Sequence, residues 1–124
     1  MEQKILDCTL RDGGLVNRFY FTDDFVRGLY QANLQAGIDY MEFGYKASEA
    51  LFDRREFGKW KFCREEDLRA VVGDNKTSMK ISVMADVGRT DYSKDILEKK
   101  NIEVPETWEQ LEAAAESLTE EGRF

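Results

Sequence analysis

Histidine is missing from this chain of 124 residues, which also holds only one proline and two cysteines. Without histidine, the chain can build neither a Cys–His nucleophile nor a zinc finger with imidazole ligands. Cys8 and Cys63 are too far apart for a Cys-x-x-Cys motif. We therefore expect two reduced cysteines that pack as small apolar side chains.

Basic charge is also scarce. The 18 Lys and Arg residues are outnumbered by 25 Asp and Glu residues, which gives a formal net charge of −7. Such a charge repels phosphate backbones and anionic lipids, so we expect no nucleic-acid partner and no membrane partner. No apolar run is as long as a membrane span, and Met1-Glu-Gln-Lys lacks the basic and apolar regions of a secretory signal. The sequence predicts a soluble, cytoplasmic protein.

Hydrophobic residues recur with periods that switch between strand-like and helix-like, which is typical of βαβ units in an α/β fold. Strands are predicted over residues 4–10, 38–45 and 80–87. Right-handed helical crossovers between them would make these strands parallel. The 42% content of hydrophobic residues is enough for a core, to which Trp60 and Phe62 are expected to belong.

Two helices are predicted between these strands. Thr22 can cap the first helix, and Asp23 and Asp24 favour the positive end of its dipole. Gly37 stands where the C-cap of this helix is expected. The second helix is predicted over residues 65–72, and a glycine follows it.

Residues 5–14 carry the strongest chemical signal in the sequence. A short apolar stretch leads into Arg11 and Asp12, which two glycines follow, so we expect a strand that delivers both charges into a tight turn. Arginine can hold a carboxylate or an oxyanion in its planar fork, and aspartate can bind a hard divalent cation. This pattern indicates an anion-binding group beside a metal ligand. A weak surface ion pair is the alternative.

The motif Asp7-x-Thr-Leu-Arg-Asp-Gly13 resembles the first-strand signature of the DRE-TIM metallolyases. This family contains 3-hydroxy-3-methylglutaryl-CoA lyase, isopropylmalate synthase and 4-hydroxy-2-oxovalerate aldolase. Residues 41–45 resemble its second-strand segment, which carries a glutamate at Glu42 here. Residues 56–63 and 80–87 resemble a bacterial aldolase-like branch. The resemblance covers residues 3 to 95.

The resemblance implies a TIM barrel with parallel strands, of which this chain provides about three of the eight βα units, since a complete barrel needs about 250 residues. It also implies a reaction that forms or cleaves a carbon–carbon bond beside the carbonyl of a 2-oxo acid, with Mg²⁺ or Mn²⁺ as cofactor. In this interpretation Asp12 is a metal ligand, and Arg11 stabilises the enolate oxygen. Glu42 supports the metal shell or an ordered water.

Two departures from the family bear on activity. The family completes its metal site with a His-x-His pair on a later strand, and its hydroxy-oxovalerate aldolases place a catalytic histidine where this chain has Gly14 and Leu15. We therefore predict that metal binding is weak or absent and that the isolated chain has no appreciable aldolase activity. The alternative is a non-catalytic, truncated or recombined α/β module that self-associates through its open strand edges. Either way, a homo-oligomer is expected.

Residues 96–124 are expected to form a linker and a C-terminal amphipathic helix. Thr107 and Gln110 have the spacing of a capping box. One face of the helix is apolar, and Gly122 ends it; the apolar residues are Leu111, Ala114, Ala115 and Leu118. Residues 102–122 resemble a helix in the solute-binding proteins of ABC sugar transporters. A chimeric chain, and a sugar-binding module, are therefore further alternatives.

Overall fold

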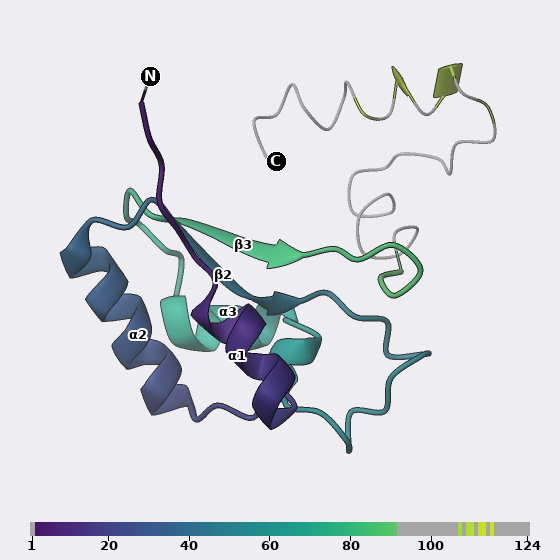
Figure 1. Ribbon diagram of the computed structural model, residues 1–124, viewed down its shortest axis with the longest axis horizontal. Helices are drawn as coiled ribbons and strands as arrows, with labels where there is room; N and C mark the ends of the chain where they lie inside the picture. Colours follow the sequence, from purple (N-terminus) through teal and green to yellow (C-terminus); the bar gives the residue numbers. More distant parts are fainter. Residues whose placement is uncertain (1, 92–106, 108, 111, 114, 116–124) are drawn as a thin grey trace. The chain divides into compact units, whose positions relative to one another are not determined.

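The computed structural model describes residues 2–91, 107, 109, 110, 112, 113 and 115. The chain divides into two units, Met1–Thr90 and Asp91–Phe124. The first unit contains three strands, three α-helices and one 3₁₀ turn (Figure 1). In chain order these are β1 (Leu6–Asp7), α1 (Thr9–Asn17), α2 (Asp23–Ala36), β2 (Tyr40–Tyr45), η1 (Lys59–Lys61), α3 (Glu65–Val72) and β3 (Lys80–Met84).

The three strands form one parallel sheet in the order β1-β2-β3. Asp7 pairs with Met41, and Met41 pairs in turn with Ile81. The register between β2 and β3 shifts between Glu42 and Tyr45. The predicted mixed α/β arrangement with parallel strands is therefore confirmed for the described residues.

The prediction for the first strand was wrong in its extent. A strand was expected over residues 4–10 with a tight turn at the glycine pair, but β1 has two residues and α1 begins at Thr9. The helix forms because the Asp12 amide donates to the Cys8 carbonyl at 2.9 Å. Gly14 lies inside α1, where a Cβ atom would stand 2.1 Å from the Phe19 ring. Its missing side chain serves close packing instead of a turn.

The predicted helix over residues 22–37 is confirmed as α2. The Thr22 hydroxyl accepts a hydrogen bond from the Phe25 amide at 3.2 Å, as expected of an N-cap. Gly37 has φ +73° and closes the helix in the left-handed conformation. The predicted helix over residues 65–72 is confirmed as α3. Local sequence signals thus place both ends of α2, and a glycine marks the end of α3.

The core lies between the sheet and the helices on one side of it. Figure 1 shows α2 and α3 on the same side of the sheet, and Met41 and Phe43 of β2 are fully buried there. Trp60 and Phe62 are also buried, which confirms their predicted place in the core. Because side chains alternate along a strand, Glu42 points away from its neighbours toward the other face of the sheet.

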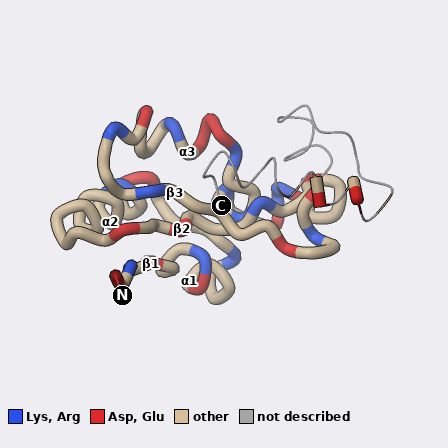
Figure 2. The backbone as a smooth tube through the Cα atoms, turned by 90° about the horizontal axis from the view of Figure 1, so that it is seen from above, with Lys and Arg blue, Asp and Glu red and all other residues tan. Residues whose placement is uncertain are grey.

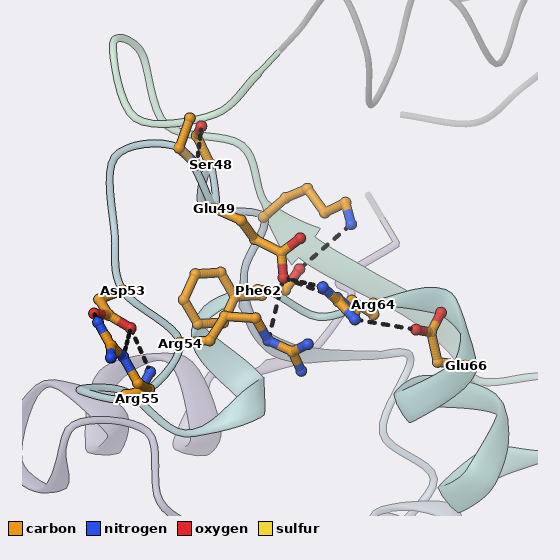
Figure 3. A network of polar contacts seen from close by, with 10 residues as sticks. Ser48, Glu49, Asp53, Arg54, Arg55, Phe62, Arg64 and Glu66 are labelled. Carbon is orange, nitrogen blue, oxygen red and sulfur yellow. Dashed lines mark hydrogen bonds and ion pairs between the residues drawn. The ribbon is translucent and has the colours of Figure 1, made fainter.

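A charged network fixes the segment that follows β2. One oxygen of Glu49 lies 3.1 Å from Arg54 Nε and 2.8 Å from Arg64 Nε (Figure 3). Arg64 precedes α3 and also pairs with Glu66 at 3.6 Å. Acidic and basic residues alternate around α3 in Figure 2. This network ties the loop after β2 to the start of α3.

The second unit is described only in part. The Thr107 amide donates to Gln110 Oε1 at 3.3 Å, and the Gln110 amide donates to Thr107 Oγ1 at 3.2 Å. These are the reciprocal bonds of the predicted capping box. The predicted helix positions Leu111, Ala114, Leu118 and Gly122 lie outside the described residues. Among the described helices, none has the length and apolar character needed to cross a membrane.

Candidate functional site

Arg11 stands between two carboxylates beside the end of β1. Its Nε lies 3.1 Å from Glu42 Oε1, and its Nη1 lies 3.1 Å from Asp12 Oδ1. Arg11 and Asp12 belong to the first turn of α1, and Glu42 belongs to β2. The structure therefore brings together all three residues that the sequence singled out, although helix geometry and not a tight turn positions two of them.

Exposure increases across the site from Glu42 to Asp12. The side chain of Glu42 is 7% exposed, that of Arg11 is 24% exposed, and that of Asp12 is 64% exposed. Arg11 Nε and Glu42 Oε1 are at ion-pair distance, yet neither atom makes a well-directed hydrogen bond within the described part of the chain. The pair is therefore electrostatic and not a bidentate fork, which leaves donor capacity on the guanidinium.

Cys8 is a fourth member of the site, although the sequence predicted only a small apolar residue at this position. Its thiol donates to Glu42 Oε2 at 3.6 Å. Burial raises the pKa of the Cys8 thiol, while the neighbouring Arg11 opposes this shift. Contact with Cys8 and the charge of Glu42 in turn raise the pKa of Arg11. Cys8 is thus a protonated donor that helps to orient Glu42. Its place directly before the Thr-Leu-Arg-Asp run was the available signal.

Asp7 does not face Arg11. Its carboxylate accepts a hydrogen bond from Asn33 Nδ2 at 2.8 Å and another from the Thr9 hydroxyl. Asn33 is a buried residue of α2. Asp7 therefore fastens β1 to α2 and fixes the point at which α1 begins.

The carboxylates do not make a complete metal site on their own. Among the described residues, no group of three His, Cys, Asp or Glu side chains is placed to hold a metal ion. Asp12 and Glu42 each already face the cation of Arg11. A divalent cation normally takes about six oxygen ligands, several of them waters in the case of Mg²⁺. This pair of carboxylates fits one edge of such a shell and no more.

Comparison with family models, curated proteins and solved structures finds no match for this chain. The resemblance to the metallolyases consequently stays a prediction that depends on the motifs and on the geometry around Arg11.

Proposed function

We propose that the chain is the N-terminal part of a divalent-metal-dependent aldolase or lyase, with about three of the eight βα units of a TIM barrel. The observation that carries this proposal is the position of Arg11 between Asp12 and Glu42, where β1 ends. In parallel α/β sheets, ligands bind at the carboxyl ends of the strands. The parallel order β1-β2-β3 supports the same assignment.

Each residue has a distinct part in the proposed reaction. Arg11 donates to the carboxylate or the developing enolate oxygen of a 2-oxo acid. Glu42 is buried and holds the guanidinium in place, so it is a positioning residue. Asp12 reaches solvent and provides one carboxylate ligand to the metal, which polarises the carbonyl when bound. The isolated chain lacks the imidazole ligands and is expected to bind substrate without turnover.

Titration calorimetry with pyruvate and with oxalate tests the anion-binding part of the proposal. We expect weak binding that Arg11→Met abolishes, because methionine removes the donors and the charge. Lys80→Met is the matched control, since Lys80 is exposed and lies on β3 away from the proposed contacts. Equal binding by the wild type and the Arg11 variant would contradict the assignment.

Paramagnetic broadening by Mn²⁺ tests the metal-binding part. Backbone amide signals near Asp12 are expected to broaden first, and Asp12→Asn is expected to remove this selectivity. Retro-aldol turnover by the isolated chain with Mn²⁺ should not exceed that of the metal alone. A rate well above this background that depended on Arg11 would overturn the expected inactivity.

A self-associating, non-catalytic module is the second candidate function. Among the described residues, β1 and β3 each have one side without a strand neighbour. Ile5 and Leu6 are 56% and 48% exposed along the β1 edge. Such edges favour pairing between chains. Analytical ultracentrifugation should detect a homo-oligomer that Leu6→Lys weakens, and a monomer at all concentrations would exclude this candidate.

A further inference from the structure

Four aromatic rings surround the amino group of Lys61, at the end of η1. Lys61 Nζ lies 4.5 Å from the centroid of the Phe52 ring and 4.8 Å from that of Tyr45. The rings of Phe19 and Phe57 follow at 5.3 and 5.5 Å. We call these four rings with the lysine the Lys61 box. Lys61 is 8% exposed, so more than nine-tenths of its surface is buried. Lysine is a residue type that is normally solvated.

The backbone holds the Lys61 box together. The Gly58 amide donates to the Arg18 carbonyl at 2.8 Å. A Cβ atom at Gly58 would stand 1.9 Å from the Phe19 carbonyl oxygen, so only glycine allows this approach. Phe19 and Tyr45 meet edge to face at 5.6 Å. The segment after α1 and the segment before η1 are therefore packed against each other, and the box is formed before any ligand arrives.

The amino group in this box is not part of any ion pair between residues that the structure describes. Among the described residues, no hydrogen bond or ion pair involves Lys61 Nζ. By contrast, Lys59 Nζ pairs with Asp23 at 2.6 Å. The charged groups that act on Lys61 are Asp86 and Arg89, which pair with each other at 3.1 Å. Lys61 is thus a largely buried residue whose amino group forms no ion pair with a carboxylate in the described part of the chain.

The Lys61 box also lies beside the carboxyl end of β2. Tyr45 is the last residue of β2, and the Lys61 carbonyl accepts from the Ala47 amide at 3.1 Å. Asp86 follows the end of β3. Carboxyl ends of parallel strands are the usual ligand-binding edge of α/β sheets. The box is therefore placed as a binding site would be.

We propose that the Lys61 amine is a reaction site that forms an imine with a small uncharged aldehyde. The nitrogen lone pair adds to the carbonyl carbon, and loss of one water gives the imine. The proton of the ammonium passes to solvent before the addition. Ring faces carry negative charge and disfavour a bound anion, whereas they provide apolar walls for an uncharged molecule. This site is separate from Arg11 and does not depend on the function proposed above.

Imine formation needs the neutral amine of Lys61, so the pKa of this residue bears on the proposal. Burial lowers the pKa of Lys61, and the charge of Arg89 lowers it further, while Asp86 opposes the shift. The rings act in the opposite direction because they attract an ammonium. Lysines in apolar pockets are the ones that proteins use for imine formation. The competition between burial and the rings decides the reactivity of the site, and it is measurable.

Reductive trapping with propionaldehyde and cyanoborohydride tests the proposal near neutral pH. Hydride adds to the imine carbon and a proton from water adds to nitrogen, which leaves a stable secondary amine. Peptide mass spectrometry then gives a labelling rate for each lysine. We expect Lys61 to react faster than Lys80, because burial lowers the pKa of Lys61 and leaves more of its amino group unprotonated. Lys80 is the matched control, since it is exposed and lies 5.7 Å from one ring, that of Tyr40. A Lys61 rate equal to or below that of Lys80 would overturn the proposal.

Three further measurements test the lowered pKa of Lys61, the uncharged class of ligand and the independence of this site from Arg11. The Lys61 rate should reach half its maximum below the ordinary lysine pKa of about 10.4. Glyoxylate, an anionic aldehyde, should label Lys61 less selectively than propionaldehyde does, and equal selectivity would refute the uncharged ligand class. Arg11→Met should leave Lys61 labelling unchanged, which distinguishes this site from the proposed oxo-acid site. The labelling rates of Lys61 and Lys80 are measured on the wild-type chain. The test therefore does not depend on whether a Lys61→Met variant folds.

Discussion

Adjacent glycines in α1 provide a sharp test of the packing around the Arg11 site. Gly13 and Gly14 lie in the same helix, and alanine favours a helix over glycine by about 1 kcal/mol at an unhindered position. A Cβ atom at Gly13 would meet Phe21 at 3.5 Å, which is an ordinary contact. A Cβ atom at Gly14 would meet three atoms of the Phe19 ring at 2.1 to 2.8 Å. The two substitutions should therefore change stability in opposite directions.

The expected magnitudes follow from these contacts. Gly13→Ala should raise the free energy of unfolding by about 0.5–1 kcal/mol. Gly14→Ala gains the same helix propensity but overpacks a ring that is 2% exposed, and overpacking costs about 1–3 kcal/mol or more. The net loss for Gly14→Ala should be about 1–2 kcal/mol, so the two variants should differ by about 1.5–3 kcal/mol.

Urea unfolding followed by circular dichroism gives both free energies. A double variant, Gly14→Ala with Phe19→Leu, serves as the control, because the smaller side chain leaves room for the added methyl group. Its loss should be smaller than the sum of the two single losses. Equal shifts for the Gly13 and Gly14 variants, or strict additivity in the double variant, would refute this account of the glycine pair.

Three other outcomes follow from the described contacts. Glu42→Gln should lower the free energy of unfolding by about 1–3 kcal/mol, because it removes the buried charge that faces the guanidinium; an unchanged urea midpoint would contradict this. Alkylation by iodoacetamide should be slower at Cys8 than in urea-unfolded chain, and slower still at Cys63, since burial raises the pKa of both thiols; equal rates in folded and unfolded protein would refute it. The pKa of Lys61 is lowered, so between that pKa and the unfolded value of about 10.4 the unfolded chain binds more protons and stability should rise with pH. The Lys61→Met variant should lack this rise. Parallel profiles of stability against pH for the wild type and the variant would contradict the prediction.

Local signals in the sequence were sufficient for the larger elements. Thr22 and Gly37 mark the ends of α2 because a cap and a left-handed glycine act within a few residues. The parallel order of the strands also followed from the alternation of strand and helix periods. The convergence of Arg11 and Glu42 agreed with the resemblance, although their chemical roles stay predictions.

Other features depended on contacts that no local pattern carries. Two glycines after Asp12 suggested a turn, but α1 continues through them, and the Phe19 ring fills the space beside Gly14. Lys61 lies between two aromatic residues in the sequence, and no local pattern there indicates a site. The rings that surround it come from segments up to about forty positions away, so its burial is a tertiary effect. Tertiary packing overrode propensity in the first case and created the chemistry in the second.

The sheet order also constrains how the first unit is made during translation. β2 needs a neighbour on each side, and its partners are distant in the chain, since Leu6 pairs with Tyr40 and Tyr40 pairs with Lys80. Nascent chains leave the ribosome from the N-terminus, and such non-local pairings form slowly. β2 therefore emerges with one side uncovered until Met84 has cleared the exit tunnel. We expect nascent chains stalled before that point to be prominent chaperone clients.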